Sequence, residues 1–146
     1  MDNKVVIGSD HGAVELKERI RDYLKQKGYE VIDVGVESAE TADYPDIASL
    51  ACREFLDGGC SFGILCCGTG IGISIAANKI DGIRCALIHD LFTAEMSKAH
   101  NNANFIAFGG RVTYSVPVEK MIDRYIETAY EGGRHERRLL KIAALE

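Results

Sequence analysis

A glycine-rich turn between an apolar run and a helical pattern constrains this chain more than any other feature. Residues 63–72 (GILCCGTGIG) begin as an apolar run that predicts a buried strand, and they end in three glycines at alternate positions. Residues 73–79 then have a helical pattern. A strand that turns through glycines into a helix presents free N–H groups and the positive end of the helix dipole. The segment therefore predicts a site for an anionic ligand.

The simplest alternative is a tight strand-to-helix connection with no ligand, although three glycines exceed what such a turn requires. Among phosphate sites, a Walker loop would need Gly-Lys-Ser/Thr, and a cysteine phosphatase loop would need an arginine after the cysteine; neither is present. A dinucleotide fingerprint requires G-x-G-x-x-G, whereas the spacing here is G-x-G-x-G. Asp90 follows the next predicted strand at a place suited to a ribose contact, so the dinucleotide interpretation is weakened rather than excluded.

Strand and helix patterns alternate along the whole chain. The predicted strands cover residues 4–9, 30–34, 62–66, 84–88 and 105–108, and a polar loop covers 35–43. The predicted helices cover residues 13–27, 44–56, 71–79, 91–99, 116–130 and 134–144. This alternation predicts an α/β protein: a three-layer αβα Rossmann-like sandwich with a five-stranded parallel sheet. Ligands of such folds bind beyond the carboxyl ends of the strands.

Length and composition predict one domain, residues 1–146, and exclude several classes of function. The chain is 47% hydrophobic and 27% charged, with a net charge of −5 and no basic run, so a nucleic-acid partner is not expected. No apolar stretch is long enough for a membrane span, and a strand pattern starts too early for a signal peptide. Five cysteines argue against a disulfide framework, and we expect Cys52, Cys60 and Cys85 to pack in the interior. The expected location is the cytoplasm.

Three candidate side chains flank the predicted turn. Cys67 stands at its mouth, where a thiol can be acidified, and the alternative is a buried spacer. Cys66 ends the strand pattern and is expected to pack. Asp10 and His11 follow the first predicted strand, so they share a crevice with Cys67 if the first and third strands are neighbours; His11 alone could also simply satisfy its loop.

The second half of the chain adds a basic segment and a helix stop. His100, Asn101 and Asn102 end a predicted helix, and on sequence alone a structural stop is favoured because these residues tolerate turns. Arg134 and Arg138 are four residues apart, so a helix would project both guanidinium groups from one side, as a phosphate dianion requires. The alternative is a solvated, ion-paired face. Apolar residues on another side suggest docking, for example on a second subunit: Leu139, Leu140, Ile142 and Leu145.

Five motifs, in order and spread over nearly the whole chain, resemble the ribose-5-phosphate isomerase type B family, which includes galactose-6-phosphate isomerase subunits. They are SDHG at 9–12, DYP at 43–45, CGTGIG at 67–72 with AANK at 76–79, HN at 100–101, and GGRH at 132–135 with Arg138. The resemblance implies an aldose–ketose isomerase that needs no metal or cofactor. It also implies a dimer or a dimer of dimers, with helix 134–144 contributing to the dimer and sites between subunits.

The resemblance also assigns roles by position. Cys67 is similar to the base that moves a proton between C1 and C2, and Thr69 and His100 are similar to a ring-opening pair. Asp10 corresponds to a sugar-hydroxyl contact and Asn101 to a contact with the enediolate. Relatives with a glutamate base exist, but this chain has Ile73 after the last glycine, which indicates the cysteine type.

The remaining implied roles concern binding. The phosphate clamp would comprise His11, Arg111, Arg134 and Arg138, with the neighbouring subunit as one source of the last two. Tyr44 would line the pocket, and main-chain N–H groups at Gly68, Gly70 and Gly72 would stabilise the enediolate. Ribose 5-phosphate is the implied substrate, with allose or galactose 6-phosphate as alternatives. A non-catalytic module that binds a nucleotide or a phosphosugar is the alternative from another class.

Overall fold

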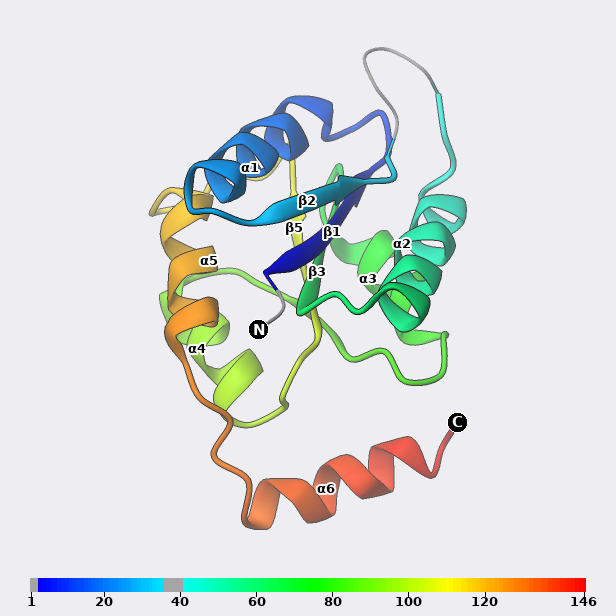
Figure 1. The fold of residues 1–146 in the computed structure, drawn as a ribbon, viewed down its shortest axis with the longest axis vertical. Coiled ribbons are helices and arrows are strands. Elements are labelled where there is room, and N and C mark those ends of the chain that lie inside the picture. The colour runs from blue at the N-terminus through cyan, green and yellow to red at the C-terminus, as the bar shows by residue number, and fades with distance from the viewer. Residues whose placement is uncertain (1–2, 36–40) are drawn as a thin grey trace.

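The computed structural model describes residues 3–35 and 41–146, and its centre is a five-stranded parallel sheet in the order β2-β1-β3-β5-β4. This architecture confirms the predicted fold class (Figure 1). The strands are β1 (Lys4–Ser9), β2 (Glu30–Asp33), β3 (Phe62–Cys67), β4 (Cys85–Leu87) and β5 (Phe105–Gly109). The order confirms that β1 and β3 are neighbours, as a shared crevice requires.

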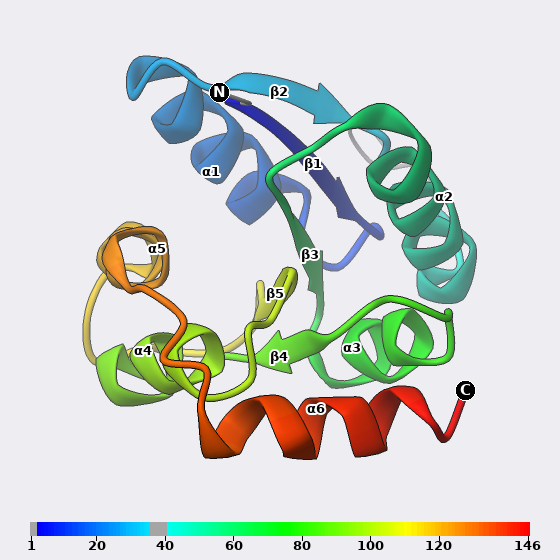
Figure 2. The ribbon, with the colours of Figure 1, turned by 60° about the horizontal axis from the view of Figure 1, so that its bottom comes forward.

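Helices cover both faces of the sheet, as the short apolar strands demand. One face packs against α1 (Val14–Gln26), α4 (Leu91–Ala99) and α5 (Val118–Glu127). The other face packs against α2 (Tyr44–Gly58) and α3 (Ile71–Asn78). The last helix, α6 (Arg134–Ala143), runs along the outside of these layers, below β4, α3 and α4 in Figure 2.

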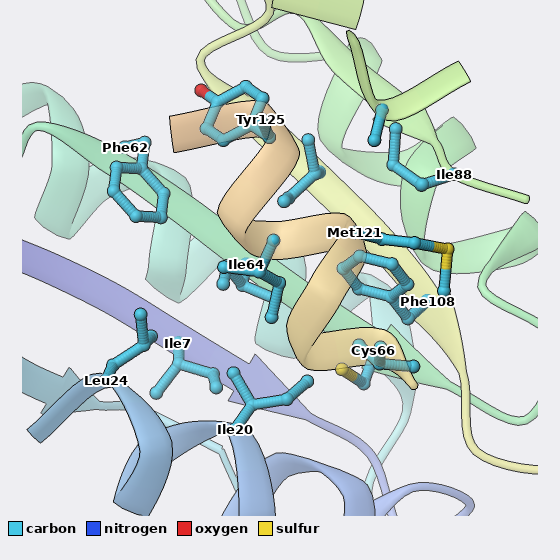
Figure 3. Packing of buried hydrophobic residues seen from close by; sticks show 14 of the residues in the cluster. Ile7, Ile20, Leu24, Phe62, Ile64, Cys66, Ile88, Phe108, Met121 and Tyr125 are labelled. Atoms are coloured by element: carbon cyan, nitrogen blue, oxygen red, sulfur yellow. The ribbon is translucent and has the colours of Figure 1, made fainter. Parts of the chain in front are cut away.

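The alternation of side chains along β3 separates the two neighbouring cysteines. Successive residues of a strand point to opposite faces, so Cys66 joins the core under α1 and α5, while Cys67 joins the core under α2 and α3. Figure 3 shows Cys66 beside Phe108 in the first of these clusters. Cys66 therefore packs, as predicted, and Cys67 leads towards the glycine-rich turn.

Several predicted boundaries need correction. The predicted strand 62–66 extends to Cys67. The predicted helix 116–130 is shorter at both ends, because Pro117 takes ψ 141° as the N-cap and Thr128 takes ψ 135° as the C-cap. Helix α2 continues to Gly58 and ends on the left-handed Gly59. Part of the predicted loop 35–43, residues 36–40, lies outside the described residues.

The strand order creates a switch point between β1 and β3. After β1 the chain moves outward to β2, and it then returns past β1 to form β3, so the connections that follow β1 and β3 diverge. Parallel sheets bind ligands in the crevice at the carboxyl ends beside such a point. Within the described ranges no helix is long and apolar enough to cross a membrane.

Candidate active site

Cys67 is held in a main-chain cradle at the switch point. It is the last residue of β3 and is only 4% exposed, and the N–H of Gly70 donates a hydrogen bond to its Sγ at 3.1 Å. Gly70 has φ 81°, and a Cβ there would lie 2.7 Å from Leu87 Cδ1 and 2.9 Å from the carbonyl carbon of Phe108, so only glycine fits. Helix α3 begins at the next residue. A donor on sulfur at a helix N-terminus suits a thiol that must carry negative charge.

The loop after β1 brings Asp10 to this cradle. The N–H of Asp10 donates to the carbonyl of Cys66 at 3.3 Å, and Asp10 Oδ1 accepts from the N–H of Gly12 at 2.8 Å. Gly12 lies against the turn, since a Cβ there would be 3.1 Å from the nitrogen of Gly68. Asp10 is 7% exposed, so its carboxylate is fixed in a crevice next to Cys67 rather than free in solvent.

The loop after β5 closes the other side. The N–H groups of Gly110 and Arg111 donate to the carbonyls of Cys67 and Gly68, each at 2.9 Å. The Arg111 guanidinium crosses the turn, with Nη1 3.0 Å from the position that a Cβ on Gly68 would take. A cation therefore stands beside the anion-binding end of α3.

Three more predicted side chains surround the entrance. Tyr44 begins α2, is 39% exposed, and its ring covers Gly72 so closely that a Cβ on Gly72 would lie 2.6 Å from Tyr44 Cζ. Thr69 is exposed, and its Oγ1 accepts from the N–H of Ile71 at 3.2 Å. His11 is exposed, with Nδ1 3.3 Å from the carbonyl oxygen of Ala42.

These residues form what we call the carboxyl-edge group: Asp10, His11, Tyr44, Cys67, Gly68, Thr69, Gly70, Gly72 and Arg111. The other predicted site residues form a second group, the α4–α6 group: His100, Asn101, Arg134 and Arg138. His100 is the C-cap of α4, and the chain runs from there to the amino end of β5. Helix α6 lies beyond the amino ends of the strands in Figure 1. Within one chain the two groups lie at opposite edges of the sheet, so the predicted pair of Thr69 and His100 is not brought together.

A cavity of about 700 Å³ lies on the α6 side of the molecule, away from Cys67. Its lining comes from α6 and from the segments around β4, and includes Arg84, Asn101, Leu139 and Ile142. Three of the four predicted apolar side chains in and after α6 are exposed: Leu140 at 63%, Ile142 at 45% and Leu145 at 86%, the last two at the cavity. This helix therefore has apolar surface left to cover.

Two residues absent from the sequence-based set contact His100. The rings of His100 and His135 are stacked with centroids 4.2 Å apart, and Glu131 Oε1 lies 3.8 Å from His100 Nε2 and 3.5 Å from His135 Nε2. His135 belongs to the GGRH motif and lies three residues before Arg138. His135 is also four residues before Leu139 and seven before Ile142, and this helical spacing could have predicted a buried side chain, but it does not identify the ring that stacks on it.

The other cysteines and Asp90 are engaged elsewhere. Burial raises the pKa of Cys66 far above its usual range, and it raises the pKa of Cys52 to about 12, so both remain protonated thiols. Cys60 and Cys85 are partly buried, and all five cysteines are free.

Asp90 caps α4: its Oδ1 accepts from the Thr93 N–H at 2.8 Å, and this bond lowers the pKa of Asp90. Strand β5 also separates β4 from β3, which counts against a ribose contact by Asp90.

Comparison with known proteins gives consistent results. Residues 5–142 match the family model for Ribose/Galactose Isomerase. The chain is 43% identical to ribose-5-phosphate isomerase B of Escherichia coli over 143 residues, covering 98% of this chain and 96% of that protein. It is similar to the structure of ribose-5-phosphate isomerase B of Clostridium thermocellum (TM-score 0.93, 45% identity, 97% and 96% covered). It is equally similar to the type B ribose 5-phosphate isomerase of Trypanosoma brucei (TM-score 0.93, 43% identity, 100% of both chains).

Proposed function

The chain belongs to the ribose/galactose isomerase family of sugar-phosphate isomerases, and we propose that it interconverts ribose 5-phosphate and ribulose 5-phosphate through an enediolate with Cys67 as the base. The observation that carries this proposal is the hydrogen bond from the Gly70 N–H to Cys67 Sγ at the β1/β3 switch point. Because this family consists of isomerases, the alternative of a non-catalytic module that binds a nucleotide or a phosphosugar is not supported.

Proton transfer by Cys67 accounts for the bond changes of this reaction. In the open-chain aldose, the Cys67 thiolate removes the proton from C2, and the electrons of that bond form the C1–C2 double bond of the enediolate while the C1 carbonyl oxygen gains negative charge. The thiol then returns the proton to C1, the proton of the C2 hydroxyl moves to the O1 oxyanion, and C2 becomes the ketone while C1 becomes a CH2OH group. No atom is gained or lost, so no redox partner is needed. A positioned base contributes about 10²–10⁴-fold to such a step.

The surroundings of Cys67 match what the enediolate needs. Main-chain N–H groups at Gly68 and Gly72 belong to the turn and to the first residues of α3, where donors and the helix dipole favour an oxyanion. The third predicted donor, the N–H of Gly70, is bonded to Cys67 Sγ instead. Asp10, fixed in the crevice, is suited to accept a hydrogen bond from a sugar hydroxyl, and Tyr44 bounds the entrance. His11 and Arg111 supply positive charge or donors for the phosphate on this side.

We infer that a complete site needs two copies of the chain. Thr69 and Cys67 lie at the carboxyl edge, whereas His100, Asn101, Arg134 and Arg138 lie at the amino edge. In a twofold dimer, the carboxyl-edge group of each subunit meets the α4–α6 group of the other, and two equal sites result. There the partner would supply the second half of the ring-opening pair, the enediolate contact of Asn101 and two arginines for the phosphate. The exposed apolar side of α6 supports this arrangement.

A coupled assay of the purified enzyme tests the substrate. We expect the highest kcat/KM with ribose 5-phosphate, a lower value with allose 6-phosphate or galactose 6-phosphate, and no activity on unphosphorylated ribose, because the arginines bind the phosphate. A preparation of Cys67→Ala is the control for contaminating isomerases. A higher kcat/KM with a hexose phosphate would reassign the substrate within the family. The cytoplasm stays the predicted location, and five free cysteines support it.

A further inference from the structure

The stacked pair of His100 and His135 joins two helices that are distant in sequence. His100 is the C-cap of α4, and His135 is the second residue of α6. Their rings are nearly parallel, with an interplanar angle of 16° and 4.2 Å between centroids. The His135 side chain is 7% exposed, whereas the His100 side chain is 36% exposed. The buried ring of His135 therefore packs against one face of the more accessible His100 ring.

The backbone around this pair is fixed by hydrogen bonds. The N–H of Glu131, in the connection between α5 and α6, donates to the carbonyl of Ala99 at 3.0 Å. The N–H of His135 donates to the carbonyl of Gly132 at 3.1 Å, which sets the first turn of α6. The contact of the two rings thus follows from the way the chain is tied to the end of α4, and it does not depend on side chains alone.

The ionisable groups that act on His135 come from the end of α4, from α6 and from the connection before α6. Burial lowers its pKa, and His100, Arg134 and Arg138 lower it further, while the Glu131 carboxylate opposes them. No described residue forms a hydrogen bond with His135 Nε2. The lowered pKa favours a neutral His135, whose ring can stack on His100 without adding a positive charge to the pair.

The ring geometry favours positioning over metal binding. His100, Glu131 and His135 offer ligand atoms within 4.8 Å of one another. However, the lone pairs of two parallel, stacked rings lie in separate planes and cannot converge on one ion at about 2 Å. Stacking instead fixes the plane of one ring against the other.

We propose that His135 is a positioning residue of the isomerase: its buried ring holds the plane of His100, so that His100 is oriented for ring opening of the cyclic sugar phosphate. This inference rests on the proposed function, in which His100 is half of the ring-opening pair. It assigns to the histidine of the GGRH motif a role separate from phosphate binding by its neighbours Arg134 and Arg138.

Steady-state kinetics of two His135 variants test the proposal. We expect His135→Ala to lower kcat about tenfold, because a loosened catalytic group loses orientation, and to change KM by less than about threefold, because the arginines stay in place. His135→Phe keeps a flat ring for stacking and should recover most of the lost kcat. Arg137→Ala, an exposed neighbour on the same helix, is the matched control and should behave like the wild type.

NMR of the histidine rings gives a readout that does not depend on activity. The chain has four histidines, and the ring signal of His100 should move in His135→Ala while those of His11 and His89 stay unchanged. A kcat within twofold of the wild type, a raised KM with unchanged kcat, an immobile His100 signal, or a lack of recovery in His135→Phe would each overturn the proposal. An inactive wild-type enzyme would instead overturn the proposed substrate, and the inference with it.

Discussion

Cys66 and Cys67 are adjacent in the chain, yet the pleat of β3 gives them different chemistry. Cys66 is fully buried under α1 and α5, where burial raises its pKa and leaves nothing for the thiol to react with. Cys67 points to the other face, ends its strand and receives a main-chain hydrogen bond on sulfur. A single step along a strand therefore separates a packing residue from the proposed base.

Substitution of the two cysteines should give opposite results. Cys67→Ala should lower kcat by about 10²–10⁴-fold with the fold retained, because the base is lost. Cys66→Ala should keep most activity but lower the free energy of unfolding by about 1 kcal/mol, because a small cavity forms in the core. Coupled assays and urea denaturation measure the two effects. Full activity of Cys67→Ala, or an equal loss in Cys66→Ala, would contradict the assignment of the base.

Also at the residue scale, we predict that Gly72 affects catalysis through the position of the Tyr44 ring. Gly72→Ala places a methyl group 2.6 Å from Tyr44 Cζ, so the ring must move away from the entrance. We expect kcat/KM to fall about tenfold. Stability should hardly change, because alanine is the better helix former. Combining the change with Tyr44→Ala separates the causes: Gly72→Ala should then cost little beyond Tyr44→Ala alone. A full additional loss would mean that Gly72 acts on the substrate directly.

At the scale of elements, α6 meets the body of the protein at its first turn, and the chain just after it does so through Glu146, whose Oε2 accepts from the Gly82 N–H at 2.6 Å. His135 is buried against His100, while the rest of the helix keeps apolar side chains exposed. The stability of this attachment should therefore depend on the protonation of His135.

Acid should weaken the fold partly through His135. Its pKa is lowered in the folded protein, so the unfolded chain binds the proton first. The contribution of His135 to stability is present above about pH 6.5, its unfolded pKa, and is lost as the pH falls through the lower folded pKa. Urea denaturation of His135→Phe at fixed protein concentration should show a smaller loss between pH 7.5 and 5.5 than the wild type. An identical pH dependence would contradict this.

The edge strand β4 is closed by a side chain rather than by another strand. Asn78 Nδ2 donates to the carbonyl of Cys85, and the Cys85 N–H donates to Asn78 Oδ1, both at 2.8 Å. The amide thus imitates a neighbouring strand at an exposed edge. Asn78→Ala should lower the free energy of unfolding by about 2 kcal/mol, because two hydrogen bonds are lost. Lys79→Ala, the exposed neighbour, is the control, and an equal effect there would remove the special role of Asn78.

At the scale of the whole molecule, the predicted site residues of one chain lie in two groups at opposite edges of its sheet, and we propose that each group is half of a site. A twofold dimer would join unlike halves, so its two sites would each draw on both subunits. This arrangement has a consequence that no single-chain site shares: two inactive variants can complement each other if they lie in different halves.

Mixed dimers of Cys67→Ala and of the double variant Arg134→Ala, Arg138→Ala test this arrangement. In a mixed dimer, one site carries both defects and the other carries neither. Random exchange of subunits should therefore restore about a quarter of wild-type activity. Each variant exchanged only with itself is the control. No recovery, with exchange verified by mass spectrometry, would place each complete site within one chain.

The sequence alone determined the order and kind of the helices and strands, since hydrophobic periodicity and glycine stops are local properties. The wrong predictions concerned only where elements begin and end, as in α5, whose limits are set by Pro117 and Thr128. The sequence also identified the turn at Cys67, because glycines between a strand and a helix are readable in one dimension. Only the tertiary structure decided that β5 separates β4 from β3, that Asp90 is occupied as a cap, and that His100 lies across the sheet from Thr69 and against His135. Those facts depend on strand order and on contacts between distant segments, which no local pattern records.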